Sequence, residues 1–506
     1  MQPTRSSTQR ALLILAWIGV VVTAAFLRFD ELTDRPMHAD EATGARLMAK
    51  RMEGQGGEFN PSHYHGPLLA DLTMPVCYLR GESSWSELSK FSLRVVTATA
   101  GLLLVLVPLM WRRSLGDLGA LAAASLLAVS PLLVYFSRMF IHEPLLTLFG
   151  ALFLGVCLRF PRWGIPGVVL GLMFAAKETF AISVLAWAAA LGILLLQERK
   201  RITLEGLRLF LSRHGKGLAL SAGAAAFTAL LCYTHGFTHL KGALDAVRTY
   251  FVYETTEGHD KPWHEYLKLL AWPRQSAGIW WYGTPVVVLA VVSYALSWSP
   301  RLQAGQSRWI QFLAHAAVFH LLIYSLISYK TPWLMCLPWA LLCWLAGLAF
   351  VGFARRARWT QVSLVLLLAA CLWTQWKQSR FATIRLHSDA RNPYAYVPTR
   401  SGVEKMGNWL QDLKEMDGHL GTVAVVGSSH WPVPWYLRKF DQVGYWLEPP
   451  PKVESYPVVV SMHEHIEKLT EQLDETHEPF TYGLRDGVPM RMFLSRELWQ
   501  QWINTP

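Results

Sequence analysis

The sequence predicts an α-helical polytopic membrane protein of about eleven transmembrane helices, followed by a small extracytoplasmic α/β domain. Apolar residues make up 52% of the 506 residues and charged residues only 16%, with a mean hydropathy of +0.23. A soluble globule of this size carries more charge than that. Apolar runs able, or nearly able, to cross a hydrocarbon core of about 30 Å recur as far as residue 376. Beyond residue 400, helix-like and strand-like patterns alternate instead.

The predicted spans share high apolarity and few charged residues. They lie at roughly 11–29, 91–111, 117–136, 142–160, 163–178, 180–197, 217–235, 280–298, 310–328, 333–353 and 359–376. Spans five and six share one apolar stretch that Lys177-Glu178-Thr179 interrupts. A helical hairpin with these residues at its outer tip is favoured, because one long span would bury Lys and Glu at mid-membrane.

The net charge of +11 reports topology, not nucleic-acid binding, because Lys and Arg gather in alternate short loops. Those loops predict a cytoplasmic N-terminus in the cell (inner or plasma) membrane. With an odd number of spans, the C-terminal domain and the long loops 30–90 and 236–279 are then extracytoplasmic. The first run could instead be a cleaved signal peptide, since Val22-Thr23-Ala24 resembles a weak cleavage site.

Three regions are expected: a membrane domain at 1–376, a linker at 377–400 and a soluble α/β domain at 401–506. In the last, 423–427 and 456–460 predict buried strands, and 401–416 and 463–475 predict helices. The aromatic segment from Trp431 to Trp446 could stack on sugar rings, or form the domain core or its seat on the membrane. The six scattered cysteines indicate neither a disulfide framework nor a zinc site.

Two polar motifs follow the first span. Asp40 and Glu41 open an apparently amphipathic helix, so they are either catalytic acids or ordinary acids of a helix N-terminus. His63 and His65 lie in a loop that contains Tyr and Pro. They could hydrogen-bond a substrate or the protein, or bind a metal if further ligands gathered there.

Three further outer motifs each contain an isolated cation. Arg138 precedes Glu143 by five residues, Lys177 adjoins Glu178, and Tyr329 adjoins Lys330. A structural Arg138–Glu143 pair could explain the first of these motifs. An interface anchor or a snorkelling side chain could explain any one of them.

Three cations at the outer surface oppose the general charge pattern. A phosphate or pyrophosphate at headgroup level would suit these cations if the fold brought them together, namely Arg138, Lys177 and Lys330. Asp40 could then take a proton from an acceptor hydroxyl as the phosphate departs from a sugar. No glycine-rich phosphate loop occurs, in keeping with a site that needs no nucleotide.

In this order, the motifs resemble the GT-C superfamily of membrane glycosyltransferases, in the branch of the protein O-mannosyltransferases and aminoarabinose transferases. Within it, the chain is most similar to a prokaryotic flippase-associated family of archaeal-type N-glycosylation systems. The resemblance rests on His-Ala-Asp-Glu, Tyr-His-Gly-Pro, Lys-Glu-Thr, Tyr-Lys-Thr-Pro-Trp and the segment from Trp431 to Arg438. The Trp-Trp-Asp motif of the oligosaccharyltransferase branch is absent from the C-terminal part.

The resemblance implies a GT-C-like fold and transfer, with inversion, of a sugar from a polyprenyl-phosphate donor to a lipid, glycan or protein acceptor on the extracytoplasmic face. It implies that Asp40 occupies the catalytic acidic position of the first outer loop and that Glu41 beside it lines the site. Phosphate or substrate would meet the residues Arg138, Lys177, Lys330, Tyr329, His63, His65, Glu143 and Glu178.

Two alternatives stay open: a flippase or flippase-accessory protein for lipid-linked sugars, and a membrane scaffold. No cofactor is required, although Asp40, Glu41, His63 and His65 would suit a divalent metal if the fold gathered them.

Overall fold

The computed structural model describes residues 6–56, 59–62, 64–159, 163–198, 203–252, 258–417 and 420–504. The chain forms two compact units. The helical unit comprises residues 1–32, 58–73 and 94–385. The C-terminal unit comprises residues 33–57, 74–93 and 386–506, so it joins most of the first outer loop to the C-terminal domain. Each unit is described by itself.

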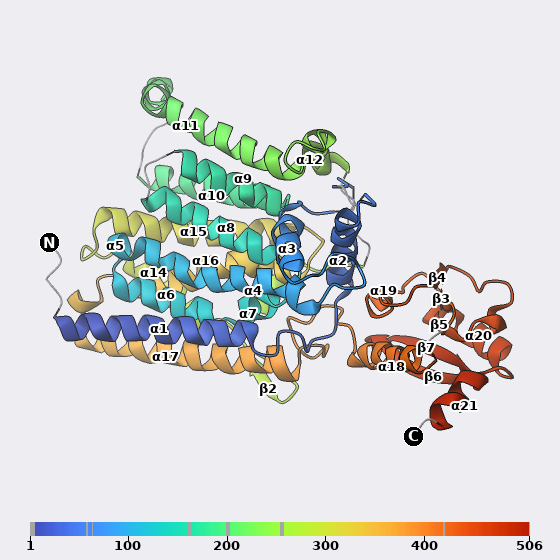
Figure 1. The fold of residues 1–506 in the computed structure, drawn as a ribbon. Coiled ribbons are helices and arrows are strands. Elements are labelled where there is room, and N and C mark those ends of the chain that lie inside the picture. The colour runs from blue at the N-terminus through green and yellow to red at the C-terminus, as the bar shows by residue number, and fades with distance from the viewer. Residues whose placement is uncertain are drawn as a thin grey trace. The chain divides into compact units, whose positions relative to one another are not determined.

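The helical unit is a bundle of apolar helices (Figure 1). Its longer helices are α1 (Ser7–Phe29), α4 (Lys90–Leu106), α6 (Asp117–Val129), α7 (Pro131–Ser137), α8 (Glu143–Arg159), α9 (Gly164–Ala176), α10 (Phe180–Gln197), α11 (Leu204–Tyr233), α12 (Lys241–Val252), α14 (Thr284–Leu296), α15 (Ala304–Leu326), α16 (Cys336–Gly347) and α17 (Arg358–Arg380). Shorter elements complete it: η1 (Val107–Trp111), α5 (Arg112–Leu115), α13 (Glu265–Leu270), the hairpin β1 (Arg274–Ser276) and β2 (Ile279–Trp281), η2 (Pro332–Met335), η3 (Leu348–Phe350), η4 (Phe353–Arg355) and the π-helical η5 (Phe381–Arg385).

Each of the eleven predicted apolar runs contains a helix in the structure, and the multi-pass character is confirmed. Among the described residues, seven helices are long and apolar enough to cross a membrane, or eight if the bent pair of α6 and α7 counts as one span. The helices α9 and α14 are apolar but shorter. The number eleven therefore stays a prediction.

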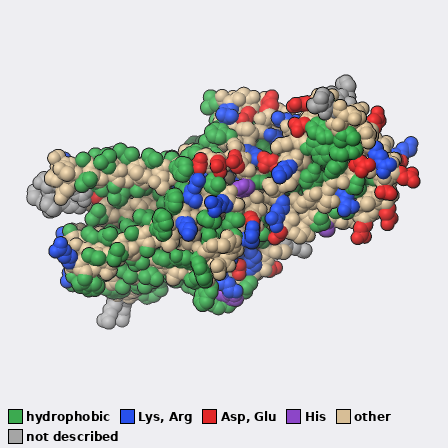
Figure 2. Space-filling model, turned by 90° about the horizontal axis from the view of Figure 1, so that it is seen from below, with side chains coloured by type: hydrophobic (Ala, Val, Ile, Leu, Met, Phe, Trp, Pro, Cys, Tyr) green, Lys and Arg blue, Asp and Glu red, His purple; other side chains and the backbone are tan. Residues whose placement is uncertain are grey.

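Many helices of this unit are apolar on all sides, so they can be buried among other helices or face lipid. The helix α16 is buried along its whole length and contacts α6, α8, α14 and α15. In Figure 2, hydrophobic side chains cover most of the visible face of the helical unit. An exposed surface this apolar is stable only in lipid.

The third predicted span is broken. The helices α6 and α7 meet at Ser130 with a bend of 59°, because Pro131 begins α7 and cannot donate a backbone hydrogen bond. The freed carbonyl groups find other donors. The Ser379 hydroxyl of α17 donates to the Val129 carbonyl at 2.6 Å, and Arg28 of α1 donates to the carbonyls of Leu127 and Ala128 at 3.0 Å each. These bonds make a broken helix tolerable inside a membrane protein.

The C-terminal unit contains a five-stranded sheet with the strand order β4-β3-β5-β7-β6. Its strands are β3 (Val423–Val426), β4 (Val443–Trp446), β5 (Val458–Met462), β6 (His477–Arg485) and β7 (Val488–Ser495). The strands β4, β3 and β5 are parallel, and β7 is antiparallel to both β5 and β6. Four strands therefore run in one direction and end at one edge of the sheet.

Helices complete this unit. They are α2 (Ala39–Met52), α18 (Ser401–Asp417), α19 (Val433–Tyr436), α20 (Ile466–Leu473) and α21 (Arg496–Asn504), with the short turns η6 (Val453–Ser455) and η7 (His463–His465). A further helix, α3 (Leu68–Leu79), has residues in both units.

The sheet core lies on one face, where alternate residues of β3 point. Its buried members are Ala424, Val426, Val453, Val459, Leu469, Leu473 and Phe493, with Trp446 packed against them. Because neighbouring residues of a strand point to opposite faces, Tyr445 points away from this cluster, and it is 43% exposed.

The outer-loop residues bind the C-terminal domain directly. The backbone N–H of Met37 donates to the Tyr436 hydroxyl at 2.9 Å, and Lys90 pairs with Glu404. The rings of Trp85 and Trp435 meet edge to face at 5.6 Å. The sequence prediction had placed these loop residues in the membrane domain.

Candidate functional site

The predicted acids lie at the start of α2, where they play different parts. His38 is the N-cap, and its ring accepts the Asp40 backbone N–H at 3.2 Å. The Glu41 carboxylate accepts the His38 backbone N–H at 3.1 Å and Arg35 at 3.4 Å, which completes a capping box. The Glu41 side chain is fully buried, whereas the Asp40 side chain is 55% exposed. Glu41 therefore caps the helix, and Asp40 is the acid that solvent or a substrate reaches.

The loop before α3 contacts the turn between α9 and α10. The His65 Nδ1 lies 3.1 Å from the Glu178 Oε2, and the His65 ring meets the His142 ring edge to face at 5.1 Å. A Cβ at Gly66 would lie 2.1 Å from the Ala175 carbonyl oxygen, so only glycine allows this approach. His63 lies outside the described residues.

Glu178 is held ionised in this cluster. Burial alone would raise its pKa, but the charge of His65, its hydrogen bond and the charge of Lys177 outweigh burial and bring the pKa to about 2. Glu178 lies in the turn between α9 and α10, at the interruption that predicted a hairpin, and the two separate helices confirm that break.

Lys177 forms a buried ion pair with Glu143. The Lys177 Nζ donates to the Glu143 Oε1 at 2.5 Å, and both side chains are 4% exposed. The alternative of a structural Arg138–Glu143 pair is therefore wrong, because the start of α8 faces the end of α9 and offers Glu143 to Lys177. We call His65, His142, Glu143, Lys177 and Glu178 the hairpin cluster.

Arg138 donates hydrogen bonds to backbone carbonyl groups. Its guanidinium donates to the carbonyls of Leu27, Asp30 and Glu31 at 3.0, 2.6 and 2.8 Å, at the C-terminal end of α1. Arg28 at that end of α1 caps α6 in the same way. The C-terminal ends of α1 and α6 are thus each capped by an arginine from another segment. The positive charge satisfies carbonyl groups that have no partner within the helix and interacts favourably with the helix dipole. The sequence analysis missed Arg28, whose only signal is a charged residue inside an apolar run.

Lys330 is 1% exposed and contacts the second outer loop. Its ammonium donates to the Ile327 carbonyl, and its backbone N–H donates to the His259 carbonyl at 3.0 Å. The Tyr329 ring meets the His259 ring at 5.0 Å. The three predicted cations are therefore not isolated: each donates to a carboxylate or to backbone carbonyls of the helical unit.

The structure brings five predicted or neighbouring residues together in the hairpin cluster. Arg138 and Lys330 have other surroundings, at the end of α1 and beside residues 259–261. Asp40 and Glu41 belong to the C-terminal unit. Among the residues that the structure describes, no three His, Cys, Asp or Glu side chains are grouped so that they could hold a metal ion.

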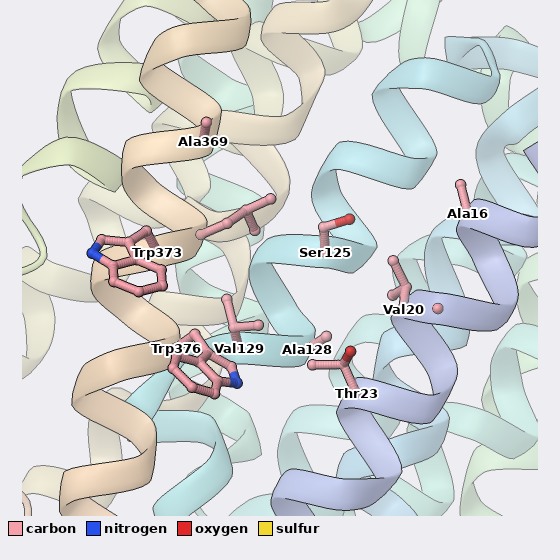
Figure 3. A pocket seen from close by; sticks show the side chains of 11 residues that line it. Ala16, Val20, Thr23, Ser125, Ala128, Val129, Ala369, Trp373 and Trp376 are labelled. Carbon is pink, nitrogen blue, oxygen red and sulfur yellow. The ribbon is translucent and has the colours of Figure 1, made fainter.

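An open cavity of about 530 Å³ lies elsewhere in the helical unit, between α1, α6 and α17. Figure 3 shows Trp373 and Trp376 of α17 on one side and Val20 and Thr23 of α1 on the other. Its lining contains none of the predicted site residues. It is therefore a groove between apolar helices, away from the predicted site residues.

Comparison with known proteins supports the fold. The sequence profile of the dolichyl-phosphate-mannose-protein mannosyltransferase family matches residues 74–212, just over a quarter of the chain. Among curated proteins, none matches the sequence significantly.

Solved structures match over nearly the whole chain. ArnT from Cupriavidus metallidurans in the apo state has a TM-score of 0.62 at 14% identity, over 96% of this chain and 98% of that one. The same protein bound to undecaprenyl phosphate gives 0.60 at 14% identity, with the same coverage. The Archaeoglobus fulgidus oligosaccharyltransferase AglB, in complex with an inhibitory peptide and a dolichol-phosphate, gives 0.55 at 14% identity, over 91% of this chain and 70% of that one.

Proposed function

We propose that the chain is a membrane glycosyltransferase with the GT-C fold, which moves a sugar from a polyprenyl-phosphate carrier to a hydroxyl acceptor on the extracytoplasmic face. One observation carries the proposal. The chain matches ArnT bound to undecaprenyl phosphate over 96% of its own length and 98% of the other. A fold hosts many functions, so the residue roles are argued from their surroundings.

Asp40 is the proposed general base. Its carboxylate is more than half exposed, whereas Glu41 is buried in the capping box. Asp40 accepts the proton of the acceptor hydroxyl as that oxygen attacks C1 of the sugar. The C1–O bond to phosphate breaks, and its electron pair leaves with the phosphate oxygen. Attack from the face opposite the phosphate inverts the configuration at C1. Glu41 is a positioning residue, which holds the first turn of α2.

Lys177 is the proposed ligand of the carrier phosphate. An ammonium stabilises the negative charge that develops on the departing phosphate, most strongly where water is excluded. Lys177 is 3% exposed and has His65 and His142 in its cluster, which can donate further hydrogen bonds. Phosphate would displace Glu143 from Lys177. We propose supporting roles for Arg138, Lys330 and Tyr329, since their present contacts are with the protein itself.

Transfer of radiolabelled sugar tests the proposal directly. Membranes receive a labelled polyprenyl-phosphate-sugar donor, and label in endogenous acceptors is counted for the wild type, Asp40→Asn and Glu41→Gln. We expect Asp40→Asn to lower transfer by roughly 10²- to 10⁴-fold, the usual contribution of a general base, at unchanged protein level. Glu41→Gln retains transfer in the fraction of protein that folds. Asp412→Asn, an exposed acid of α18, is the matched control.

Two results would overturn the transferase proposal. One is transfer that Asp40→Asn leaves intact, and the other is no transfer by the wild type with a suitable donor present. If lipid-linked sugar changed leaflet in both the wild type and Asp40→Asn, the flippase alternative would replace it. A parallel sample with chelator reports whether a divalent metal takes part.

A further inference from the structure

The carboxyl edge of the C-terminal sheet gathers polar and aromatic side chains. The strands β3, β4, β5 and β6 all end at this edge. In open α/β sheets, ligands bind outside the carboxyl ends of parallel strands, where chain connections leave in opposite directions. Here β3 connects to β4 on one side, and β5 lies on its other side and connects onward to β6 and β7. The segment after β3 is Gly427-Ser428-Ser429-His430-Trp431.

Arg485 ends β6 and reaches this segment. Its guanidinium donates to the Ser429 carbonyl at 3.3 Å. Its Nε is buried and has no hydrogen-bond partner within the part of the chain that the structure describes. A buried polar atom of this kind calls for a missing partner. Burial lowers the pKa of Arg485, and the nearby charge of Asp40 opposes that shift. Asp40 therefore lies close enough to Arg485 for their charges to interact.

Aromatic rings line the same place. The His430 ring lies 5.1 Å from the Tyr445 ring and 6.3 Å from the Trp431 ring, at interplanar angles of 37° and 33°. Tyr445 points away from the sheet core and is 43% exposed. Arg46 of α2 lies near enough to Tyr445 for its charge to act on the phenol. Rings exposed beside guanidinium groups are suited to the apolar faces and hydroxyl groups of sugars.

We propose that Arg485, Tyr445 and His430, beside Asp40, form the acceptor-binding surface of this protein, and that the acceptor is a saccharide. The inference rests on the proposed function, in which Asp40 deprotonates the acceptor hydroxyl. The Arg485 guanidinium orients a sugar hydroxyl or carboxylate, and Tyr445 and His430 stack on the ring. This arrangement makes the C-terminal domain part of substrate recognition, and it distinguishes Tyr445 from Trp435 and Trp446, which pack into the protein.

Ligand-observed NMR by saturation transfer tests this on the full chain in nanodiscs, without any donor. The probes are methyl β-D-glucopyranoside, methyl β-D-glucuronide and the blocked tripeptide Ala-Ser-Ala. We expect saturation of at least one glycoside and not of the tripeptide. Tyr445→Ala and Arg485→Gln should each weaken glycoside binding about tenfold, the loss that corresponds to one stacked ring or one charged hydrogen bond.

Tyr445→Phe keeps the ring and should keep binding within about twofold. Arg496→Gln, which removes an exposed arginine paired with Glu478 on the same domain, should have no effect.

The outcomes separate this inference from the proposed function, because the same variants are also assayed for sugar transfer. Glycoside binding that is unchanged by Tyr445→Ala and Arg485→Gln overturns the inference, and so does preferential binding of the tripeptide. Transfer by the wild type would continue in either case. A wild type without transfer overturns the proposed function alone if the glycoside still binds through Tyr445 and Arg485.

Discussion

The buried pair of Lys177 and Glu143 gives the sharpest test of the hairpin cluster. Both side chains are 4% exposed and their charged atoms lie 2.5 Å apart. Removing one partner of a buried pair leaves an uncompensated charge, which costs about 3–5 kcal/mol. Lys177→Met leaves Glu143 without its cation, so we expect it to lower the free energy of unfolding by about 4 kcal/mol. Glu143→Gln should cost less, about 3 kcal/mol, because Lys177 still interacts with Glu178.

The double variant Lys177→Met/Glu143→Gln should be no less stable than Lys177→Met alone. The coupling free energy would then be about 3 kcal/mol, at the upper end for contacting residues. Reversible unfolding in mixed micelles of SDS, followed by tryptophan fluorescence, measures all four proteins. The exposed pair Arg496–Glu478, at 3.1 Å, is the control, and its coupling should stay below about 1 kcal/mol.

A coupling below about 1 kcal/mol between Lys177 and Glu143 would refute the reasoning, because a desolvated pair couples more strongly than that. The double variant also separates stability from function. If it folds but transfers no sugar and loses donor binding, Lys177 serves the phosphate. If it folds and transfers normally, Lys177 is only a structural partner of Glu143.

Three further predictions concern the helical unit. The Glu178 pKa is about 2 in the folded protein and about 4.3 when unfolded. As pH falls from about 5, the unfolded carboxyl is therefore protonated first, and the wild type loses on the order of 3 kcal/mol more than Glu178→Gln by about pH 2. SDS midpoints at several pH values measure this, and parallel pH curves would contradict it. Arg28→Met should cost about 3 kcal/mol in the same assay, because the carbonyls of Leu127 and Ala128 lose their donor inside the membrane. A loss below about 1 kcal/mol would show that other donors replace it. Gly66→Ala must move the loop that carries His65, since its Cβ would lie 2.1 Å from the Ala175 carbonyl oxygen. We expect lower transfer at near-normal protein level, whereas unchanged transfer would show that the loop's position does not matter.

Local patterns in the sequence predicted much of the fold. The break at Lys177-Glu178-Thr179, the helix after Asp40 and the strands near 423 and 458 are confirmed, because periodicity and charge decide them within a few residues. The strands β6 and β7 were not predicted, although Phe480, Tyr482 and Leu484 of β6 show a strand-like alternation and β7 is largely buried.

The sequence alone did not predict which groups the polar residues contact. Glu143 could pair with Arg138 or Lys177, and only the packing of α8 on α9 decides between them. The backbone carbonyls that hold Arg28 and Arg138 leave no trace in a sequence, because every residue has one. The approach of Asp40 to Arg485 joins positions 445 residues apart, which no local pattern reports.

The break at Ser130 also bears on how the protein is made. Its Val129 carbonyl is satisfied by Ser379, which the ribosome adds 250 residues later. Until α17 enters the bilayer, the early helices hold an unsatisfied polar group that lipid cannot solvate. The junction between α6 and α7 is therefore fully hydrogen-bonded only after α17 has been synthesised and has packed against it.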